Sequence, residues 1–105
     1  MASEQVIRVV KKYLELLRAR GIPVTRGVIF GSHARGEAGP ESDIDVLVIS
    51  PLFDQDSRAR GADLWLAALE ADEHIEPIGV GEKVFAEDDV SPILEWARQE
   101  GISVE

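Results

Sequence analysis

Residues 28–50 read VIFGSHARGEAGPESDIDVLVIS, and this stretch decides the fold and the candidate site. Two apolar runs enclose a segment that is too rich in Gly, Ser and Pro for a long helix. The apolar runs predict two buried strands, 25–30 and 43–50, with at most one or two helical turns between them. A Gly-Ser turn closes the first strand, and two carboxylates, Asp43 and Asp45, open the second.

The rest of the chain alternates helical and extended patterns. We expect a helix from Ser3 to about Arg20, a helix that begins after Asp54 or Asp56 and continues to about Ala71, a strand over 73–80, a turn around Gly81, a helix over 92–100 and a short strand over 102–104. The order α-β-α-β-α-β-α predicts an α+β fold, a small mixed β-sheet flanked by helices, in a single domain over 1–105. Pro77 predicts that its strand lies at an edge or a bulge.

Apolar residues at helical spacing predict which helix faces are buried. The expected core residues are Val6, Val9, Val10, Tyr13, Leu14, Leu16 and Leu17 in the first helix, Ala59, Ala62, Trp65, Leu66 and Leu69 in the second, and Val90, Ile93, Leu94, Trp96 and Ala97 in the last. For the two tryptophans, a place in the core is favoured over a base-stacking platform.

Composition restricts the class of protein. The 105 residues include no cysteine, which excludes a disulfide framework and a thiolate metal site and favours the cytoplasm. No apolar run approaches the roughly 20 residues of a membrane span. The net charge of −9 argues against a broad nucleic-acid surface.

The charge is unevenly distributed. Residues 1–36 carry 7 Lys and Arg against 2 Asp and Glu, a net charge of +5. Residues 37–105 carry 4 against 18, a net charge of −14, and the two parts sum to −9. This asymmetry has two interpretations. Either the first helix has a solvated basic face, or the basic part meets an anionic ligand or an acidic partner surface.

Asp43 and Asp45 predict a metal site. Side chains alternate along a strand, so both carboxylates project from one face, about 6.6 Å apart along the chain. Their repulsion requires cations, and the strand contains no Lys or Arg. Mg²⁺ binds through one or two carboxylates and completes its coordination with water and phosphate oxygens.

The Gly-Ser turn supplies the expected phosphate contacts. Gly31 lets phosphate approach the backbone, and Ser32 offers a hydroxyl and an amide donor. A third acid is needed if two metal ions share the site, and Glu76 is the candidate, projecting outward with His74 while Ile75 faces the core. Glu76 would then ligate a metal and take a proton from the attacking hydroxyl.

Gly31-Ser32, Asp43-Ile44-Asp45 and a later strand carboxylate resemble the nucleotidyltransferase superfamily that includes DNA polymerase β. The fuller string Gly-Ser-x-Ala-Arg-Gly…Ser-Asp-Ile-Asp is similar to its smallest branch, the minimal nucleotidyltransferases. The resemblance implies two Mg²⁺ ions held by Asp43, Asp45 and Glu76, and transfer of a nucleotidyl group, often AMP from ATP, to a hydroxyl. Glu76 departs from the Asp that is common there, so an exposed edge-strand charge is the alternative for it.

Short members of this branch lack an acceptor-binding domain. The resemblance therefore implies a separate helical HEPN-type partner in a toxin–antitoxin pair, in which the nucleotidyltransferase is the antitoxin and attaches AMP to a tyrosine. Two alternatives remain: a module that neutralises such a partner by contact alone, and a nucleotidyltransferase of a small molecule such as an antibiotic, for which a homodimer could build the acceptor pocket.

Four other residues have competing interpretations. Arg35 either contacts phosphate, the role we assign to it, or pairs on the surface with Glu37 or Glu41. For His33, a lining or solvent-exposed position is favoured over catalysis. His74 and Lys83 are expected to be a polar surface residue and a solvated turn residue, respectively, rather than parts of the site.

Overall fold

The computed structural model describes residues 2–105. Its elements in chain order are α1 (Glu4–Ala19), β1 (Arg26–Phe30), α2 (Ser32–Arg35), β2 (Ile44–Ile49), α3 (Leu52–Gln55), α4 (Gly61–Ala71), β3 (Ile75–Val80), α5 (Glu82–Glu87), α6 (Pro92–Glu100) and β4 (Ile102–Val104). The predicted α+β class is confirmed. Within residues 2–105 no helix has the length and apolar character of a membrane span.

The four strands form one mixed sheet in the order β3-β2-β1-β4. β1 is antiparallel to both β2 and β4, whereas β2 and β3 are parallel. β3 is therefore an edge strand, as Pro77 predicted, because proline has no N–H to donate to a neighbouring strand. The start of β2 consequently lies between the end of β1 and the start of β3.

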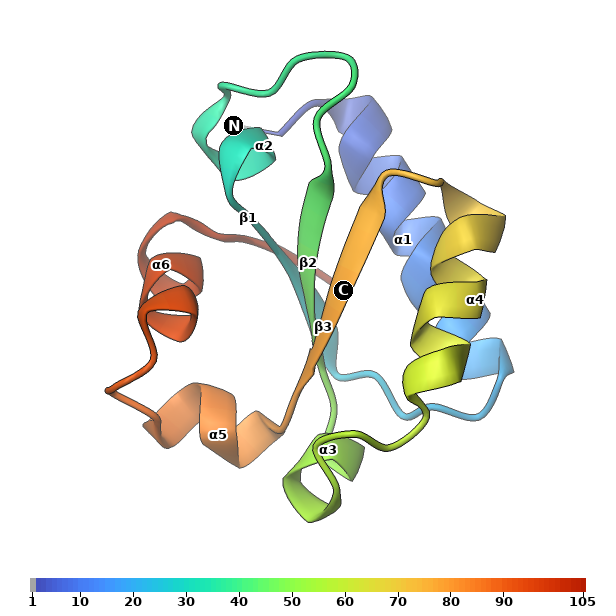
Figure 1. The fold of residues 1–105 in the computed structure, drawn as a ribbon, viewed down its shortest axis with the longest axis vertical. Coiled ribbons are helices and arrows are strands. Elements are labelled where there is room, and N and C mark those ends of the chain that lie inside the picture. Colours follow the sequence, from blue (N-terminus) through green and yellow to red (C-terminus); the bar gives the residue numbers. More distant parts are fainter. Residues whose placement is uncertain (1) are drawn as a thin grey trace.

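Each face of the sheet has its own apolar core. One core contains Ile29, Val46, Val48 and Ile75 and is covered by α1 and α4, whereas the other contains Val28, Phe30, Leu47 and Ile49 and is covered by α5 and α6. Figure 1 shows α1 and α4 together on one side of the sheet, with α5 and α6 on the other. This double covering explains the continuous apolar runs in β1 and β2.

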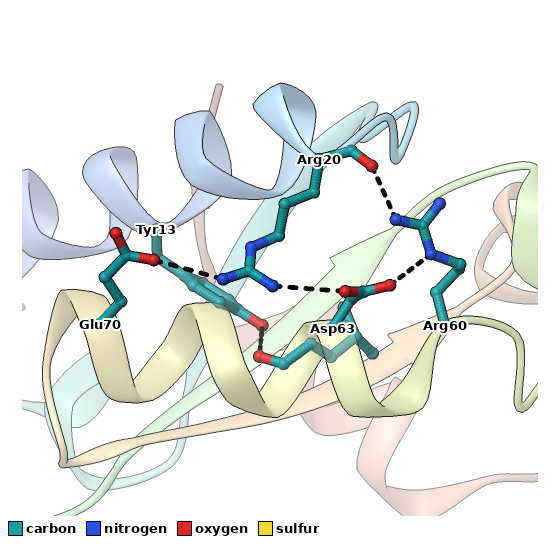
Figure 2. A network of polar contacts seen from close by, with 6 residues as sticks. Tyr13, Arg20, Arg60, Asp63 and Glu70 are labelled. Carbon is teal, nitrogen blue, oxygen red and sulfur yellow. Dashed lines mark hydrogen bonds and ion pairs between the residues drawn. The ribbon is translucent and has the colours of Figure 1, made fainter.

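A network of polar contacts joins α1 to α4 (Figure 2). The buried Tyr13 hydroxyl donates to the carbonyl oxygen of Leu64 at 2.9 Å. Arg20 forms ion pairs of 3.3 Å with both Asp63 and Glu70. Arg60 pairs with Asp63 and donates to the carbonyl oxygen of Arg20. These contacts fix the two helices against each other, and we call them the α1–α4 seam.

The first helix forms as predicted. Ser3 caps it by accepting from the amide of Val6 at 3.2 Å, and Gly21 follows it with φ +87°. The second predicted helix is wrong at its start: α3 occupies residues 52–55, and α4 begins only at Gly61, after Arg60 has adopted a left-handed conformation with φ 55°. The region after Gly81, predicted as a turn, forms the short helix α5.

The predicted buried face of α4 is also wrong. Leu64, Ala67 and Ala68 are buried, whereas Trp65, Leu66 and Leu69 are 50, 55 and 64% exposed. α4 carries two apolar stripes, and the structure buries the one with small residues, which allow a close approach to α1 and the sheet. In α6, Leu94 and Ala97 are buried as predicted, but Ile93 and Trp96, like Val90 before the helix, are exposed. The expectation that Val90, Ile93 and both tryptophans belong to the core is therefore corrected.

Candidate functional site

The turn after β1 depends on Gly31. Its φ of 74° and ψ of −150° are essentially restricted to glycine. A Cβ at this position would lie 2.4 Å from Oδ2 of Asp45, so only glycine allows the backbone to pass so close to that carboxylate. Ser32 then begins α2, and Gly36, with φ 75°, follows its end. The expectation of one or two helical turns between Ser32 and Gly36 is confirmed.

Three carboxylates meet at one end of the sheet. Asp45 lies opposite Phe30 of β1 and opposite Glu76 of β3, and Asp43 immediately precedes β2 on the same face by alternation. Ile44, between the two aspartates, is buried in the core under α1 and α4. The parallel register of β2 and β3 therefore brings Glu76 beside the aspartates, and we call the three residues the acid cluster.

The acids of this cluster influence one another. Loss of solvation is the main cause that raises the pKa of Asp45, and the charge of Asp43 adds to it, while His33 and Arg35 act in the opposite direction. The pKa of Glu76 is raised chiefly by the charge of Asp43, with desolvation, a hydrogen bond to Asp43 and the charge of Asp45 contributing. The cluster thus concentrates negative charge that a cation would relieve.

The acid cluster has no ion-pair partner within residues 2–105. None of its three acids forms an ion pair with a Lys, Arg or His side chain of that range. Nor do any three His, Cys, Asp or Glu side chains in that range converge closely enough, as they stand, to hold a metal ion. The donor chemistry nevertheless fits Mg²⁺, because three carboxylates on adjoining strand positions supply only oxygen ligands and excess negative charge.

Arg35 lies between the site and the last helix. It pairs with Glu37 at 3.1 Å and with Glu100 of α6 at 3.6 Å, so it has one of the partners expected for a surface arginine and one that was not foreseen. Its charge lowers the pKa of Asp45, so it also lies within electrostatic reach of the cluster. The predicted phosphate contact of Arg35 would require it to exchange these acidic partners for a ligand.

The two histidines lie on the loop side of the site. His33 approaches the carbonyl oxygen of Ser42 with Nε2 at 3.3 Å, so it spans the loop between β1 and β2. His74 contacts Asp72 through Nδ1 at 2.9 Å, and the hydrogen bond with Asp72 is the main cause that raises its pKa. Lys83 is an exposed residue of α5, not of a turn.

Two neighbouring cavities flank the segment between β1 and β2. One, of about 370 Å³, lies between the start of α1, residues 39–42 and the Asp72–His74 turn, and a second, of about 320 Å³, adjoins it through His33. A cavity of about 500 Å³ lies at the opposite end of the sheet, around Thr25 and Pro51. Sequence reasoning missed the cavity beside Asp72 because its walls come from three distant segments and share no spacing.

Comparison with known proteins gives the family. The sequence profile described as "Nucleotidyltransferase domain" matches residues 10–97. A solved protein from Sulfolobus solfataricus, assigned as a nucleotidyltransferase, superposes with a TM-score of 0.62 and 17% identity over 94% of this chain and 78% of its own. A toxin–antitoxin structure with AMP-PNP superposes with a TM-score of 0.59 and 22% identity over 88% of this chain and 68% of its own.

No curated protein sequence matches the chain. The structural likenesses, at these identities, establish the fold, and the profile match covers the turn, the acid cluster and most of the helices around them. The resemblance to the nucleotidyltransferase superfamily is therefore confirmed over residues 10–97. The chain belongs to the nucleotidyltransferase domain family and is an enzyme of that kind.

Proposed function

We propose that the chain is a single-domain, Mg²⁺-dependent nucleotidyltransferase that transfers AMP from ATP to a hydroxyl of a partner protein. The observation that carries this proposal is the acid cluster: three carboxylates without a cationic partner in residues 2–105, on one face of adjacent strands, beside a turn that only glycine can make. The partner would be a helical HEPN-type toxin, with this chain as its antitoxin. A toxin–antitoxin neighbour solved with AMP-PNP is consistent with that assignment.

Asp43, Asp45 and Glu76 would hold two Mg²⁺ ions. Bound Mg²⁺ supplies charge neutralisation for the triphosphate and its pyrophosphate leaving group and lowers the pKa of the attacking hydroxyl. The acceptor oxygen forms a bond to the α-phosphorus as the bond from that phosphorus to the bridging oxygen of pyrophosphate breaks. Glu76 would also accept the proton of the attacking hydroxyl.

Gly31, Ser32 and Arg35 would bind the phosphates. Gly31 leaves the turn without a side chain where the triphosphate must approach, and Ser32 adds a hydroxyl donor. Arg35 pairs with Glu37 and Glu100, and its charge also lowers the pKa of Asp45, so it lies within electrostatic reach of the acid cluster. Nucleotide phosphates would replace those two carboxylates as its partners.

The test is transfer from ATP labelled at the α-phosphate to the purified product of the neighbouring gene, with and without Mg²⁺. Asp43→Ala, Asp45→Ala and Glu76→Ala should each lower label transfer by at least about 100-fold, because each removes charge stabilisation of the transition state. Asp89→Ala is the matched control, since Asp89 is an exposed acid in the link between α5 and α6.

Binding is measured separately by thermal unfolding with MgATP. A ligand at a hundredfold excess over its Kd stabilises the folded state by about 2.7 kcal/mol, and Asp43→Ala and Asp45→Ala should remove the shift. A partner that is inhibited but stays unlabelled would show that the chain neutralises it by contact and not by nucleotidyl transfer. An absent thermal shift in the wild-type protein would count against the nucleotide site itself.

A further inference from the structure

Asp43 is the acid of the cluster that lies outside the paired part of the sheet. β2 begins at Ile44, and its pairing reaches Asp45 on the side of β1 and Ile44 on the side of β3. Asp45 and Glu76 are therefore fixed by partners on a neighbouring strand, whereas Asp43 precedes the first paired residue. Its position depends on the two residues that flank it, Ser42 and Ile44.

The residue after Asp43 is held by β3. The amide of Ile44 donates to the carbonyl oxygen of His74 at 2.7 Å, and the Ile44 side chain is buried in the core under α1 and α4. The residue before it, Ser42, bonds to its own segment: its amide donates to the carbonyl oxygen of Gly39 at 3.2 Å, and its hydroxyl accepts from the amide of Gly39 at 2.9 Å. These bonds close a turn but do not attach it to the rest of the fold.

A contact that does attach Ser42 to the rest of the fold comes from His33 of α2. Nε2 of His33 lies 3.3 Å from the carbonyl oxygen of Ser42. A carbonyl oxygen only accepts, so this contact is a hydrogen bond when Nε2 carries a proton. The oxygen belongs to the peptide group that joins Ser42 to Asp43, and a planar peptide group moves as one unit. The bond therefore restrains Asp43 from its N-terminal side.

The helix that carries His33 begins at the turn predicted to bind phosphate. α2 starts at Ser32, directly after Gly31, and His33 is its second residue. The amide of Arg35 donates to the carbonyl oxygen of Gly31 at 3.2 Å, which closes this helical turn. His33 thus joins the expected phosphate turn to the segment that leads into Asp43.

We propose that His33 is a positioning residue, which holds Asp43 for metal binding through the peptide group between Ser42 and Asp43. This inference rests on the proposed function, because it assigns a metal to the acid cluster. Groups that orient metal ligands through hydrogen bonds contribute a factor of about 10–100 to metal affinity or activity. In this role His33 acts through Asp43 and contacts neither metal nor nucleotide.

The surroundings of His33 accommodate informative substitutions. Its side chain is half-buried and lines both cavities beside the segment between β1 and β2, of about 370 and 320 Å³. Glutamine fits the same space, and its side-chain amide nitrogen lies as many bonds from Cα as Nε2 of histidine. His33→Gln therefore keeps a donor for the Ser42 carbonyl oxygen, whereas His33→Leu keeps a similar volume without a donor.

Backbone relaxation of the metal-free protein tests the restraint itself. The order parameter of the Asp43 amide should be about 0.85 in the wild type and fall below about 0.6 in His33→Leu. His33→Gln should restore it, while Ile44 stays rigid in both variants because its bond to His74 is unchanged. An Asp43 amide that is equally ordered in His33→Leu and in the wild type would overturn the proposal.

The ring of His33 gives a spectroscopic signature of the same bond. The hydrogen bond that a histidine ring makes determines which of its nitrogens carries the proton. The ¹⁵N spectrum of the wild-type protein should therefore show a proton on Nε2 of His33. A neutral ring with its proton on Nδ1 alone would contradict the bond to Ser42.

Metal binding is measured by calorimetric titration of the full chain with Mg²⁺, in the presence of ATP and without an acceptor. His33→Leu should raise the Kd for Mg²⁺ about 10–100-fold, and His33→Gln should return it to within about threefold of the wild type. Gln5→Ala is the matched control: Gln5 lines the larger cavity from α1, and its substitution should leave the Kd unchanged.

The outcomes separate this role from the proposed function. Absence of Mg²⁺ binding in the wild type would overturn both. Normal wild-type binding that His33→Leu leaves unchanged would overturn only the role of His33. So would a loss of affinity that His33→Gln fails to restore or that Gln5→Ala reproduces, because the cause would then be the altered cavity and not the lost donor. The relaxation measurement needs neither metal nor nucleotidyl transfer.

Discussion

The pKa values of carboxylates are shifted in opposite directions in the α1–α4 seam and in the acid cluster. In the seam, Asp63 accepts from Arg60 and Arg20, and the hydrogen bond from Arg60 is the main cause that lowers its pKa. In the cluster, the pKa values of Asp45 and Glu76 are raised, by lost solvation and by the charge of Asp43. The carboxylate of Asp63 is thus neutralised within the chain, whereas the three acids of the cluster have no ion-pair partner in residues 2–105.

The largest expected effect comes from breaking the geometry of the cluster. In Gly31→Ala, the new Cβ would fall 2.4 Å from Oδ2 of Asp45, so the carboxylate must move. We expect nucleotidyl transfer to fall at least about 100-fold, because displacement of a reacting or ligating group by about 1 Å costs this much. Initial rates of label transfer measure the effect.

Gly39→Ala is the control for that substitution. A Cβ at Gly39 would meet only the Oγ of Ser42, at 4.0 Å, and its backbone is not left-handed. Its transfer rate should match the wild type. Equal rates in the Gly31 and Gly39 variants would show that the close approach of the turn to Asp45 is irrelevant to the chemistry.

A second substitution breaks the seam instead. Tyr13 is fully buried, and its hydroxyl donates to Leu64. Tyr13→Phe leaves that carbonyl oxygen without its partner and should lower the free energy of unfolding by about 1–2 kcal/mol, measured by urea denaturation, without changing MgATP affinity. Burial also raises the pKa of Tyr13, and it is the one tyrosine of the chain, so its ionisation at 295 nm should appear only as the protein unfolds in alkali. Titration of the folded protein near pH 10 would contradict the buried position.

The smallest expected effects are shifts of the melting temperature, of opposite sign for one acid from each region. Without metal, Glu76→Gln should raise the melting temperature by about 1–3 °C, because it removes repulsion within the cluster. Asp63→Asn should lower it, because Arg20 and Arg60 lose their shared partner. Scanning calorimetry in EDTA measures both, and shifts of the same sign would remove the electrostatic distinction between the regions.

Glu76 and Asp63 should also make the stability of the fold depend on pH, in the directions given by their pKa shifts. The raised pKa of Glu76 means that the folded state holds its proton more tightly, so stability falls as pH rises from the ordinary carboxyl value through the raised one. The lowered pKa of Asp63 contributes stability above the ordinary value that is lost as pH falls through the lowered one. Glu76→Gln should remove the first dependence and Asp63→Asn the second.

Much of the fold follows from local pattern. The uninterrupted apolar runs around Gly31 predicted β1 and β2, and Pro77 predicted the edge position of β3. The stripes of α4 could not be predicted, because both are apolar at the same period, and only packing decides that the side with Ala67 and Ala68 is buried. α5 was missed because six residues after a glycine carry too little periodicity to distinguish a short helix from a turn.

The candidate site was predicted in part. Strand alternation places Asp43 and Asp45 on one face from the sequence alone. That Glu76 joins them depends on the parallel register opposite Asp45, which no local signal contains. The ion pair of Arg35 with Glu100 could not be predicted from the sequence either, because it joins residues far apart in the chain. The roles of all these residues in catalysis remain predictions for the experiments above.

The parallel pairing of β2 with β3 also has a kinetic consequence. Gly31 and Asp45 meet through an antiparallel pair of neighbouring strands, whereas Glu76 reaches them only after residues 50–74 have crossed from one strand to the next. Closing the longer loop takes more chain entropy, and contacts between distant residues form late in folding. The third carboxylate should therefore join the other two near the end of folding, and Mg²⁺ present during refolding should accelerate that last step by screening the approach of like charges.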